Sequence, residues 1–132
     1  MKDQRIIPVC EPVLDGNERA YVLDCLDTNW VSSSGKYIPL FEEMFSRACG
    51  ASCGVACSSG TTAIHLALAA LEIGPGDEVI VPCFSLIVLA NAVILSGARP
   101  VFVDVDPYTW CIDPERIEEK ITPRTRAIMV VH

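Results

Sequence analysis

The stretch Ala56-Cys57-Ser58-Ser59-Gly60-Thr61-Thr62-Ala63-Ile64-His65-Leu66-Ala67-Leu68 is the most informative part of this sequence. An apolar run over 54–57 is followed at once by small hydroxyl residues around one glycine, and then by a helical pattern over 61–71. Such residues at a strand-to-helix turn leave backbone N–H groups exposed at the positive end of the helix dipole. The sequence therefore predicts an anion site, suited to a phosphate group, at this Ser-Ser-Gly-Thr-Thr turn.

Beyond this turn, short apolar runs alternate with helical patterns. Glycine and proline separate the elements, most clearly at Gly74-Pro75-Gly76, Pro82 and Gly97. Continuous apolar strands between helices are typical of a parallel sheet that is covered on both faces. The predicted fold class is therefore α/β, with a mostly parallel sheet and helices on both faces. Strands are expected at 54–57, 78–81, 100–103 and 127–131, and helices at 61–71, 85–95 and 114–121.

Two further helices are expected before the alternating region. The first spans 15–26 with Asp15 as its cap, and the second spans 36–48. The second has an apolar stripe that is expected to face the core, made of Ile38, Leu40, Phe41, Met44 and Phe45. This pattern predicts an N-terminal helical segment over residues 1–50 and an α/β region over 51–132.

Composition restricts the class of protein. The chain has 132 residues, of which 51% are hydrophobic and 20% charged, which is typical of a globular protein. Its formal net charge of −7, with scattered basic residues, argues against binding to nucleic acid. The seven cysteines form no C-x-x-C pair and only two histidines are present, so no metal site is expected. With no signal-peptide pattern and no membrane-spanning run, a soluble, cytoplasmic protein is expected.

Five segments carry a resemblance to a known family. In order they are Asn29–Tyr37 with Phe41-Glu42-Glu43, Ser59–Ala63, Gly74–Pro82, Ala90–Val93 and Gly97–Asp106. Together they resemble the N-terminal part of the DegT/DnrJ/EryC1/StrS family, the sugar-nucleotide aminotransferases that use pyridoxal 5'-phosphate (PLP), and the first segment most resembles perosamine-synthase-type members. The resemblance implies the large, PLP-binding domain of a fold type I transferase, of which residues 51–132 would be the first part.

The resemblance implies cofactor contacts for four residues. Gly60, Thr61 and Thr62 would hold the PLP phosphate, which agrees with the anion site derived from the turn. The alternative at this turn is a plain capped helix. Leu86 falls where most members carry an aromatic residue or histidine that stacks on the pyridine ring. Leucine can cover the ring by dispersion but lacks the stacking contribution of about 1 kcal/mol.

Trp30 and Ser33 would lie near the mouth of the sugar-nucleotide site by the same resemblance, although a tryptophan before a serine-rich loop equally suits a packing anchor. The family also uses a Schiff-base lysine and a carboxylate that pairs with the pyridinium nitrogen. Lys2, Lys36 and Lys120 stand in no matching motif. No catalytic residue is therefore assigned, and this chain alone is expected to be inactive.

The expected activity of the complete protein is the transfer of an amino group, from glutamate or a similar donor, to a keto nucleotide sugar, with a homodimer as the working form. Three alternatives stay open. A sugar dehydratase of the same family would have histidine in place of the Schiff-base lysine. A non-catalytic interaction module would not need the cofactor. A metal-dependent glycosyltransferase is suggested by the acid pair Asp104 and Asp106, which otherwise reads as a turn.

Overall fold

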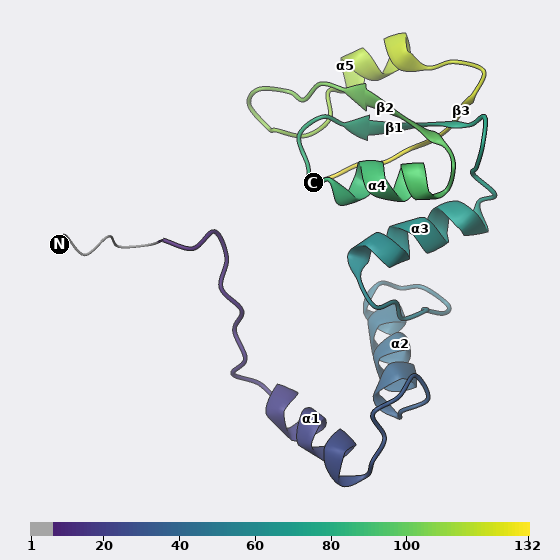
Figure 1. Cartoon of the computed structure of the whole chain (residues 1–132). Helices are drawn as coiled ribbons and strands as arrows, with labels where there is room; N and C mark the ends of the chain where they lie inside the picture. The colour runs from purple at the N-terminus through teal and green to yellow at the C-terminus, as the bar shows by residue number, and fades with distance from the viewer. Residues whose placement is uncertain (1–6) are drawn as a thin grey trace, which may run out of the picture. The chain divides into compact units, whose positions relative to one another are not determined.

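The computed structural model describes residues 7–132. Two compact units make up the chain: unit 1 ends at Ala56, and unit 2 runs from Cys57 to His132 (Figure 1). The boundary expected between residues 50 and 51 stays a prediction. In the described part of the chain, no helix has both the length and the apolar character needed to cross a membrane.

Unit 1 contains the two expected N-terminal helices, α1 (Glu18–Asp27) and α2 (Tyr37–Ala48). The predicted cap of α1 is wrong, because the helix begins at Glu18 and its N-cap residue is Asn17, which makes no capping bond with its side chain. The carboxylate of Glu18 instead accepts a hydrogen bond from the N–H of Gly16 at 2.9 Å. An acid in the first turn thus replaces the predicted cap at Asp15.

The apolar stripe of α2 does not face a core within unit 1. Ile38 is half-buried, whereas Leu40, Phe41, Met44 and Phe45 are exposed. With Tyr21 and Val22 of α1, these four side chains line an open groove of about 580 Å³. The periodicity correctly predicted an amphipathic helix, but it could not predict what covers the apolar face.

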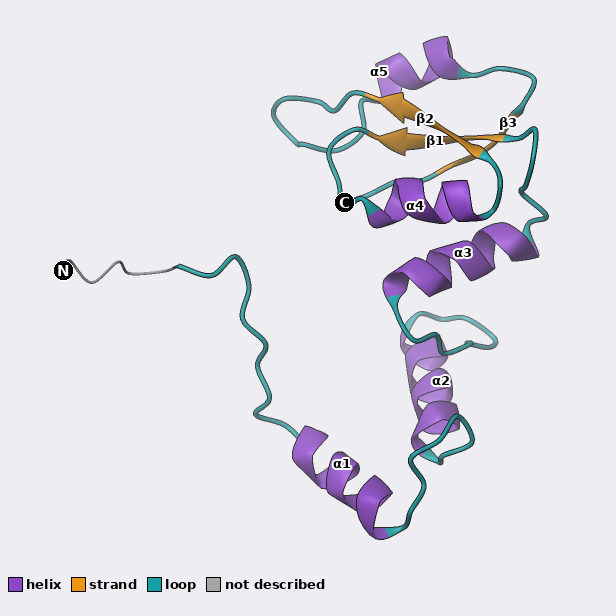
Figure 2. Ribbon diagram, in the orientation of Figure 1, coloured by secondary structure: helices purple, strands orange, loops and turns teal. Residues whose placement is uncertain are grey.

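Unit 2 is built on a three-stranded parallel sheet (Figure 2). The strands are β1 (Glu78–Pro82), β2 (Arg99–Val103) and β3 (Thr125–Ile128), in the spatial order β2-β1-β3. The helices are α3 (Gly60–Ala70), α4 (Val88–Leu95) and α5 (Pro114–Ile117), and a 3₁₀ turn over Glu118–Lys120 extends α5. Both strand pairings are parallel.

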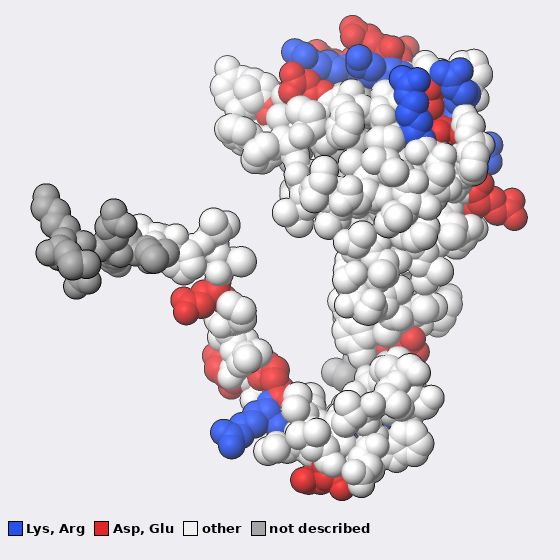
Figure 3. Space-filling model, viewed as in Figure 1, with Lys and Arg blue, Asp and Glu red and all other residues white. Residues whose placement is uncertain are grey.

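Helices cover both faces of this sheet. Val79 and Val81 of β1 pack with Leu68 of α3 and Val93 of α4 in one buried cluster. Ile80, which points the opposite way in the pleat, belongs to a second cluster that α5 reaches through its partly buried Ile117. The predicted α/β class with helices on both faces is confirmed. In Figure 3, charged side chains gather on the α5 side of unit 2, and the side of α3 and α4 in this view shows few.

One predicted strand is absent. Residues 54–57 form no ladder in the described chain. In unit 1, the N–H of Ala56, which a strand would use for pairing, donates instead to Oε1 of Glu42 at 2.8 Å. An apolar run therefore becomes a strand only where a neighbouring strand is available to pair with it.

The last strand begins two residues earlier and ends three residues earlier than predicted. β3 begins at Thr125 and ends at Ile128, whereas the apolar pattern predicted 127–131. The N–H of Met129 still donates to the carbonyl of Ile80 at 2.8 Å, so one strand-like contact extends beyond the assigned end. The polar residues at the start of the strand, half-buried Thr125 and exposed Arg126, hid its beginning from a pattern based on hydrophobicity.

Candidate functional site

The first turn of α3 is closed by a reciprocal cap. The Oγ of Ser59 accepts a hydrogen bond from the N–H of Thr62 at 3.3 Å, and Oγ1 of Thr62 accepts one from the N–H of Ser59 at 3.1 Å. The Thr62 hydroxyl also donates to the carbonyl of Ser59 at 2.8 Å. This capping box fixes the direction in which the helix begins. The hydroxyl of Thr62 is therefore engaged inside the protein.

The amides of Gly60 and Thr61 have a different environment. Within residues 7–132 neither N–H has a hydrogen-bond partner. A Cβ placed on Gly60 would meet nothing within 4 Å, so the backbone is open on that side. Free N–H groups at the positive end of an eleven-residue helix suit an anion. The residues at this turn therefore fit a phosphate group, through the backbone of Gly60 and Thr61 and the unengaged hydroxyl of Thr61.

This turn lies at the carboxyl edge of the sheet. Figure 2 shows the first turn of α3 on the side of unit 2 toward which the arrowheads of β1 and β2 point, and where α4 begins. Parallel α/β sheets bind their ligands at this edge. Leu86, in the segment between β1 and α4, is 75% exposed. It lines a pocket of about 420 Å³ together with Phe84, Trp110 and His132. The structure thus places Leu86 at the same edge as Gly60, Thr61 and Thr62.

The aromatic side of this pocket was missed by sequence reasoning. Trp110 stands in a left-handed backbone conformation with φ of 60°, and its ring lies 5.0 Å from that of Phe84, centroid to centroid, at 55°. The sequence offered one signal, a large aromatic residue shortly after the turn at 104–107. Nothing in the sequence paired that residue with Leu86, because the two are distant along the chain.

The acid pair after β2 is committed to local contacts. Asp104 accepts a hydrogen bond from Sγ of Cys83 at 3.3 Å and forms an ion pair with Arg116 at 3.4 Å. Asp106 accepts bonds from the N–H and the hydroxyl of Thr109, at 2.7 and 2.9 Å. Backbone N–H donors hold the pKa of both acids below their usual value. These local contacts favour the turn.

A buried acid occupies the opposite, amino edge of the sheet and was also missed. Glu78, the first residue of β1, is only 2% exposed. Its carboxylate accepts hydrogen bonds from the hydroxyl of Thr122 at 2.6 Å and from Nη2 of Arg124 at 2.7 Å. Arg99, at the start of β2, lies 3.8 Å away. The Thr122 hydroxyl first, and then Arg124, lower the pKa of Glu78.

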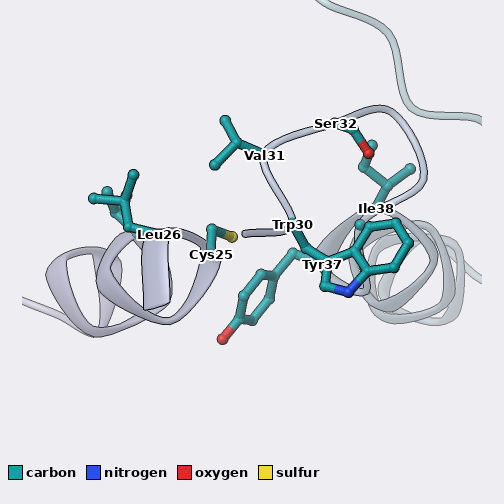
Figure 4. Close-up of a pocket in the computed structure, with 9 residues that line it drawn as sticks. Cys25, Leu26, Trp30, Val31, Ser32, Tyr37 and Ile38 are labelled. Atoms are coloured by element: carbon teal, nitrogen blue, oxygen red, sulfur yellow. The ribbon is translucent and has the colours of Figure 1, made fainter. Parts of the chain in front are cut away.

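In unit 1, Trp30 lines a pocket of about 330 Å³ and is 56% exposed (Figure 4). The walls come from α1, α2 and the loop between them, and they are apolar except for Ser32 and Tyr37. Ser33 is exposed on that loop and is not among the lining residues. The structure therefore places Trp30, but not Ser33, on a pocket.

The loop over 29–35 is anchored to both helices of unit 1. The N–H of Trp30 donates to the carbonyl of Cys25 at 3.0 Å, which fixes the loop to the end of α1. Asp24 accepts a hydrogen bond from the hydroxyl of Tyr37 at 3.0 Å and forms an ion pair with Lys36 at 2.7 Å. Lys36 first, and then Tyr37, lower the pKa of Asp24. The ion pair of Lys36 thus links the start of α2 to α1.

Comparison with known proteins identifies the family. Residues 12–132 match the DegT/DnrJ/EryC1/StrS aminotransferase family. The chain belongs to this family. The resemblance inferred from the five sequence segments is thereby confirmed.

Relatives of this DegT/DnrJ/EryC1/StrS chain are longer than it is. It is 55% identical over 132 residues to the GDP-perosamine synthase of Caulobacter vibrioides, matching 100% of the chain and 36% of that protein. The GDP-perosamine synthase of Escherichia coli O157:H7 is 48% identical over 128 residues, or 97% of the chain and 35% of that protein. A putative sugar aminotransferase from Streptococcus pneumoniae, solved in its PMP form, has a TM-score of 0.86 at 33% identity, over 94% of this chain and 31% of that one. The chain spans about a third of the length of the curated relatives it matches.

Proposed function

We propose that this chain is the N-terminal part of a PLP-dependent aminotransferase that transfers an amino group, from glutamate or a similar donor, to a keto nucleotide sugar. The observation that carries the proposal is the first turn of α3, where the amides of Gly60 and Thr61 stand open at the carboxyl edge of a parallel sheet. Membership of the DegT/DnrJ/EryC1/StrS family supports it, as do relatives named as GDP-perosamine synthases. PLP, when bound, supplies the electron sink that amino-group transfer requires.

The residues in the first turn of α3 contribute to phosphate binding in different ways. Gly60 and Thr61 donate backbone N–H groups to it, and Thr61 adds its hydroxyl. Thr62 acts through the cap, because its hydroxyl is bonded to Ser59 and keeps the first turn in place. Leu86 covers one face of the pyridine ring by dispersion. In this proposal the fold is that of a fold type I transferase, and residues 51–132 begin its large domain.

Unit 1 supplies the mouth for the nucleotide sugar. Trp30 offers an exposed apolar surface beside its pocket, and Ser33 offers a hydroxyl on the adjacent loop. We assign no catalytic residue to this chain, since Lys36 is paired with Asp24 and Lys120 lies in the 3₁₀ turn after α5. The Schiff-base lysine belongs to the remaining part of the protein, which acts in the cytoplasm as a homodimer.

The test uses the complete product of the gene. Binding of PLP is measured by absorbance and equilibrium dialysis, and the product formed from glutamate and a keto nucleotide sugar is identified by mass spectrometry. Tight PLP binding, weaker binding of pyridoxal without its phosphate, and an amino-sugar product are expected. A product that has lost water, with histidine in place of the lysine, would identify a dehydratase. A protein that binds PLP and pyridoxal equally well would contradict the phosphate site.

A pair of adjacent threonines provides the matched control. Thr61→Val removes a hydroxyl that is free in unit 2, so PLP affinity should fall by about fivefold to tenfold while the melting temperature stays unchanged. Thr62→Val removes the hydroxyl that closes the cap and should lower the melting temperature. If both variants lose stability and neither loses PLP, the turn is a structural cap only.

A further inference from the structure

The pocket at the carboxyl edge of unit 2 has aromatic walls to which the proposed function assigns no role. Trp110 is 59% exposed, and its ring packs against that of Phe84 at 5.0 Å. Both side chains line the pocket of about 420 Å³ that Leu86 also lines. Three large apolar side chains around one open pocket provide a surface for a flat, partly apolar ligand.

Trp110 is held firmly in this position. Its φ of 60° is uncommon for any residue with a side chain. Its N–H donates to the carbonyl of Asp106 at 2.9 Å, and the N–H of Asp106 donates in turn to the carbonyl of Cys111, also at 2.9 Å. An antiparallel bridge between Val105 and Ile112 closes the loop at its base. Strained conformations that the surroundings enforce in this way are concentrated at ligand sites.

We propose that Trp110 contacts the planar ring of PLP in this pocket, beside Leu86. The inference rests on the proposed function, because it takes the phosphate to be held at the first turn of α3. The first turn of α3 lies on the side toward which the arrowheads of β1 and β2 point (Figure 2). Leu86 and Trp110, which line the pocket, belong to the segments that follow β1 and β2 at that same edge. An indole ring supplies the aromatic contact that Leu86 lacks. Because its loop is closed by its own hydrogen bonds, Trp110 is oriented before the ligand arrives.

The test measures binding without the covalent step. The probe is pyridoxine 5'-phosphate, which has no aldehyde and cannot bond to a lysine, and the protein is the complete gene product. Trp110→Gly removes the ring, and glycine accepts a φ of 60° without strain, so this variant should fold. Trp110→Phe keeps an aromatic ring. Trp30→Phe, in unit 1, is the control for tryptophan fluorescence.

We expect Trp110→Gly to lower the affinity for the probe by about fivefold to tenfold. Trp110→Phe, which keeps an aromatic ring, should retain most of the wild-type affinity. The change in tryptophan fluorescence that the probe causes should be smaller in Trp110→Phe than in the wild type, and of wild-type size in Trp30→Phe. Equal affinity in the wild type and Trp110→Gly, or a fluorescence change as large in Trp110→Phe as in the wild type, would overturn the inference alone. If the wild type itself fails to bind the probe, the proposed function fails with it. If Trp110→Gly does not fold, the inference is tested by comparing the fluorescence change of Trp110→Phe with that of the wild type.

Discussion

The two edges of the parallel sheet in unit 2 differ in two respects: whether their polar groups have hydrogen-bond partners, and whether their large side chains are buried. At the amino edge, Glu78 is buried and its carboxylate is bonded to Thr122 and Arg124. At the carboxyl edge, Leu86 and Trp110 are exposed and the amides at the start of α3 are open. Strands of four or five residues separate the two edges. The sheet is thus closed by its own contacts at one edge and open at the other.

The largest expected effect is on stability, from a change at the closed edge. Glu78→Gln keeps the shape of the side chain but removes the charge that Arg124 and Arg99 face. The buried side chain of residue 78 then loses its charge-assisted hydrogen bonds from Arg124 and presents an amide N–H group to that donor, so the melting temperature should fall by about 10 °C. Thermal unfolding followed by circular dichroism measures this effect.

The matched control is Glu119→Gln in the 3₁₀ turn, where the side chain is exposed and should tolerate the change. The affinity of Glu78→Gln for pyridoxine 5'-phosphate, measured below its melting temperature, should stay close to that of the wild type. A loss of affinity as large as that of Trp110→Gly would show that the two edges are not independent.

The same carboxylate predicts how stability depends on pH. Its hydrogen bonds to Thr122 and Arg124 lower the pKa of Glu78 in the folded protein below the value of 4.5 for a free side chain. The unfolded chain therefore binds a proton first as the pH falls, so the contribution of Glu78 is complete above about pH 5 and is lost as the pH drops through the lowered pKa. The free energy of unfolding is measured with denaturant between pH 3 and 7, in steps of about half a pH unit. As the pH falls, it should decrease less steeply for Glu78→Gln than for the wild type. Identical slopes in the two proteins would contradict this assignment.

The sequence predicted the limits of some elements closely in both units. In unit 1, α2 lies within one residue of its expected limits, and in unit 2 so do β1 and β2, each of which lies next to glycine or proline. The run at 54–57 is also apolar, but among the described residues no strand lies beside it and it stays unpaired. The stripe of α2 predicted a core that unit 1 does not contain. Local patterns therefore indicate which surface a segment can bury, and the neighbouring segments decide whether it does.

The candidate site was predicted only where its chemistry is local. The turn at Gly60, Thr61 and Thr62 could be recognised because its hydroxyl residues, its glycine and the helix are contiguous. Glu78 and Trp110 could not, because their partners are distant in sequence: Thr122 and Arg124 follow Glu78 by more than 40 residues, and Trp110 meets Phe84 across two loops. The roles of all the candidate site residues, Gly60, Thr61, Thr62, Leu86, Trp30 and Ser33, stay predictions.

A smaller effect is expected from the cap of α3. Ser59→Ala removes the oxygen that accepts from the N–H of Thr62 and should destabilise unit 2 by about 1 kcal/mol. Ser58→Ala is the matched control, because its Oγ makes only a 3.4 Å contact with the Thr62 hydroxyl. Denaturant midpoints of the two variants measure the difference. Equal midpoints would mean that the cap does not stabilise the turn.

The smallest expected effect sharpens the comparison at the open edge itself. Leu86→Tyr adds an aromatic ring to the pocket. It should raise the affinity for pyridoxine 5'-phosphate by about fivefold, the equivalent of a stacking contribution of about 1 kcal/mol. If Trp110 already contacts the same ring, the gain should be smaller in the wild type than in a Trp110→Gly background, because the two aromatic rings then compensate for one another. A double-mutant cycle of binding constants measures this coupling. Equal gains in both backgrounds would mean that Leu86 and Trp110 act at separate places in the pocket, and an unchanged or weaker affinity would remove Leu86 from the ring site.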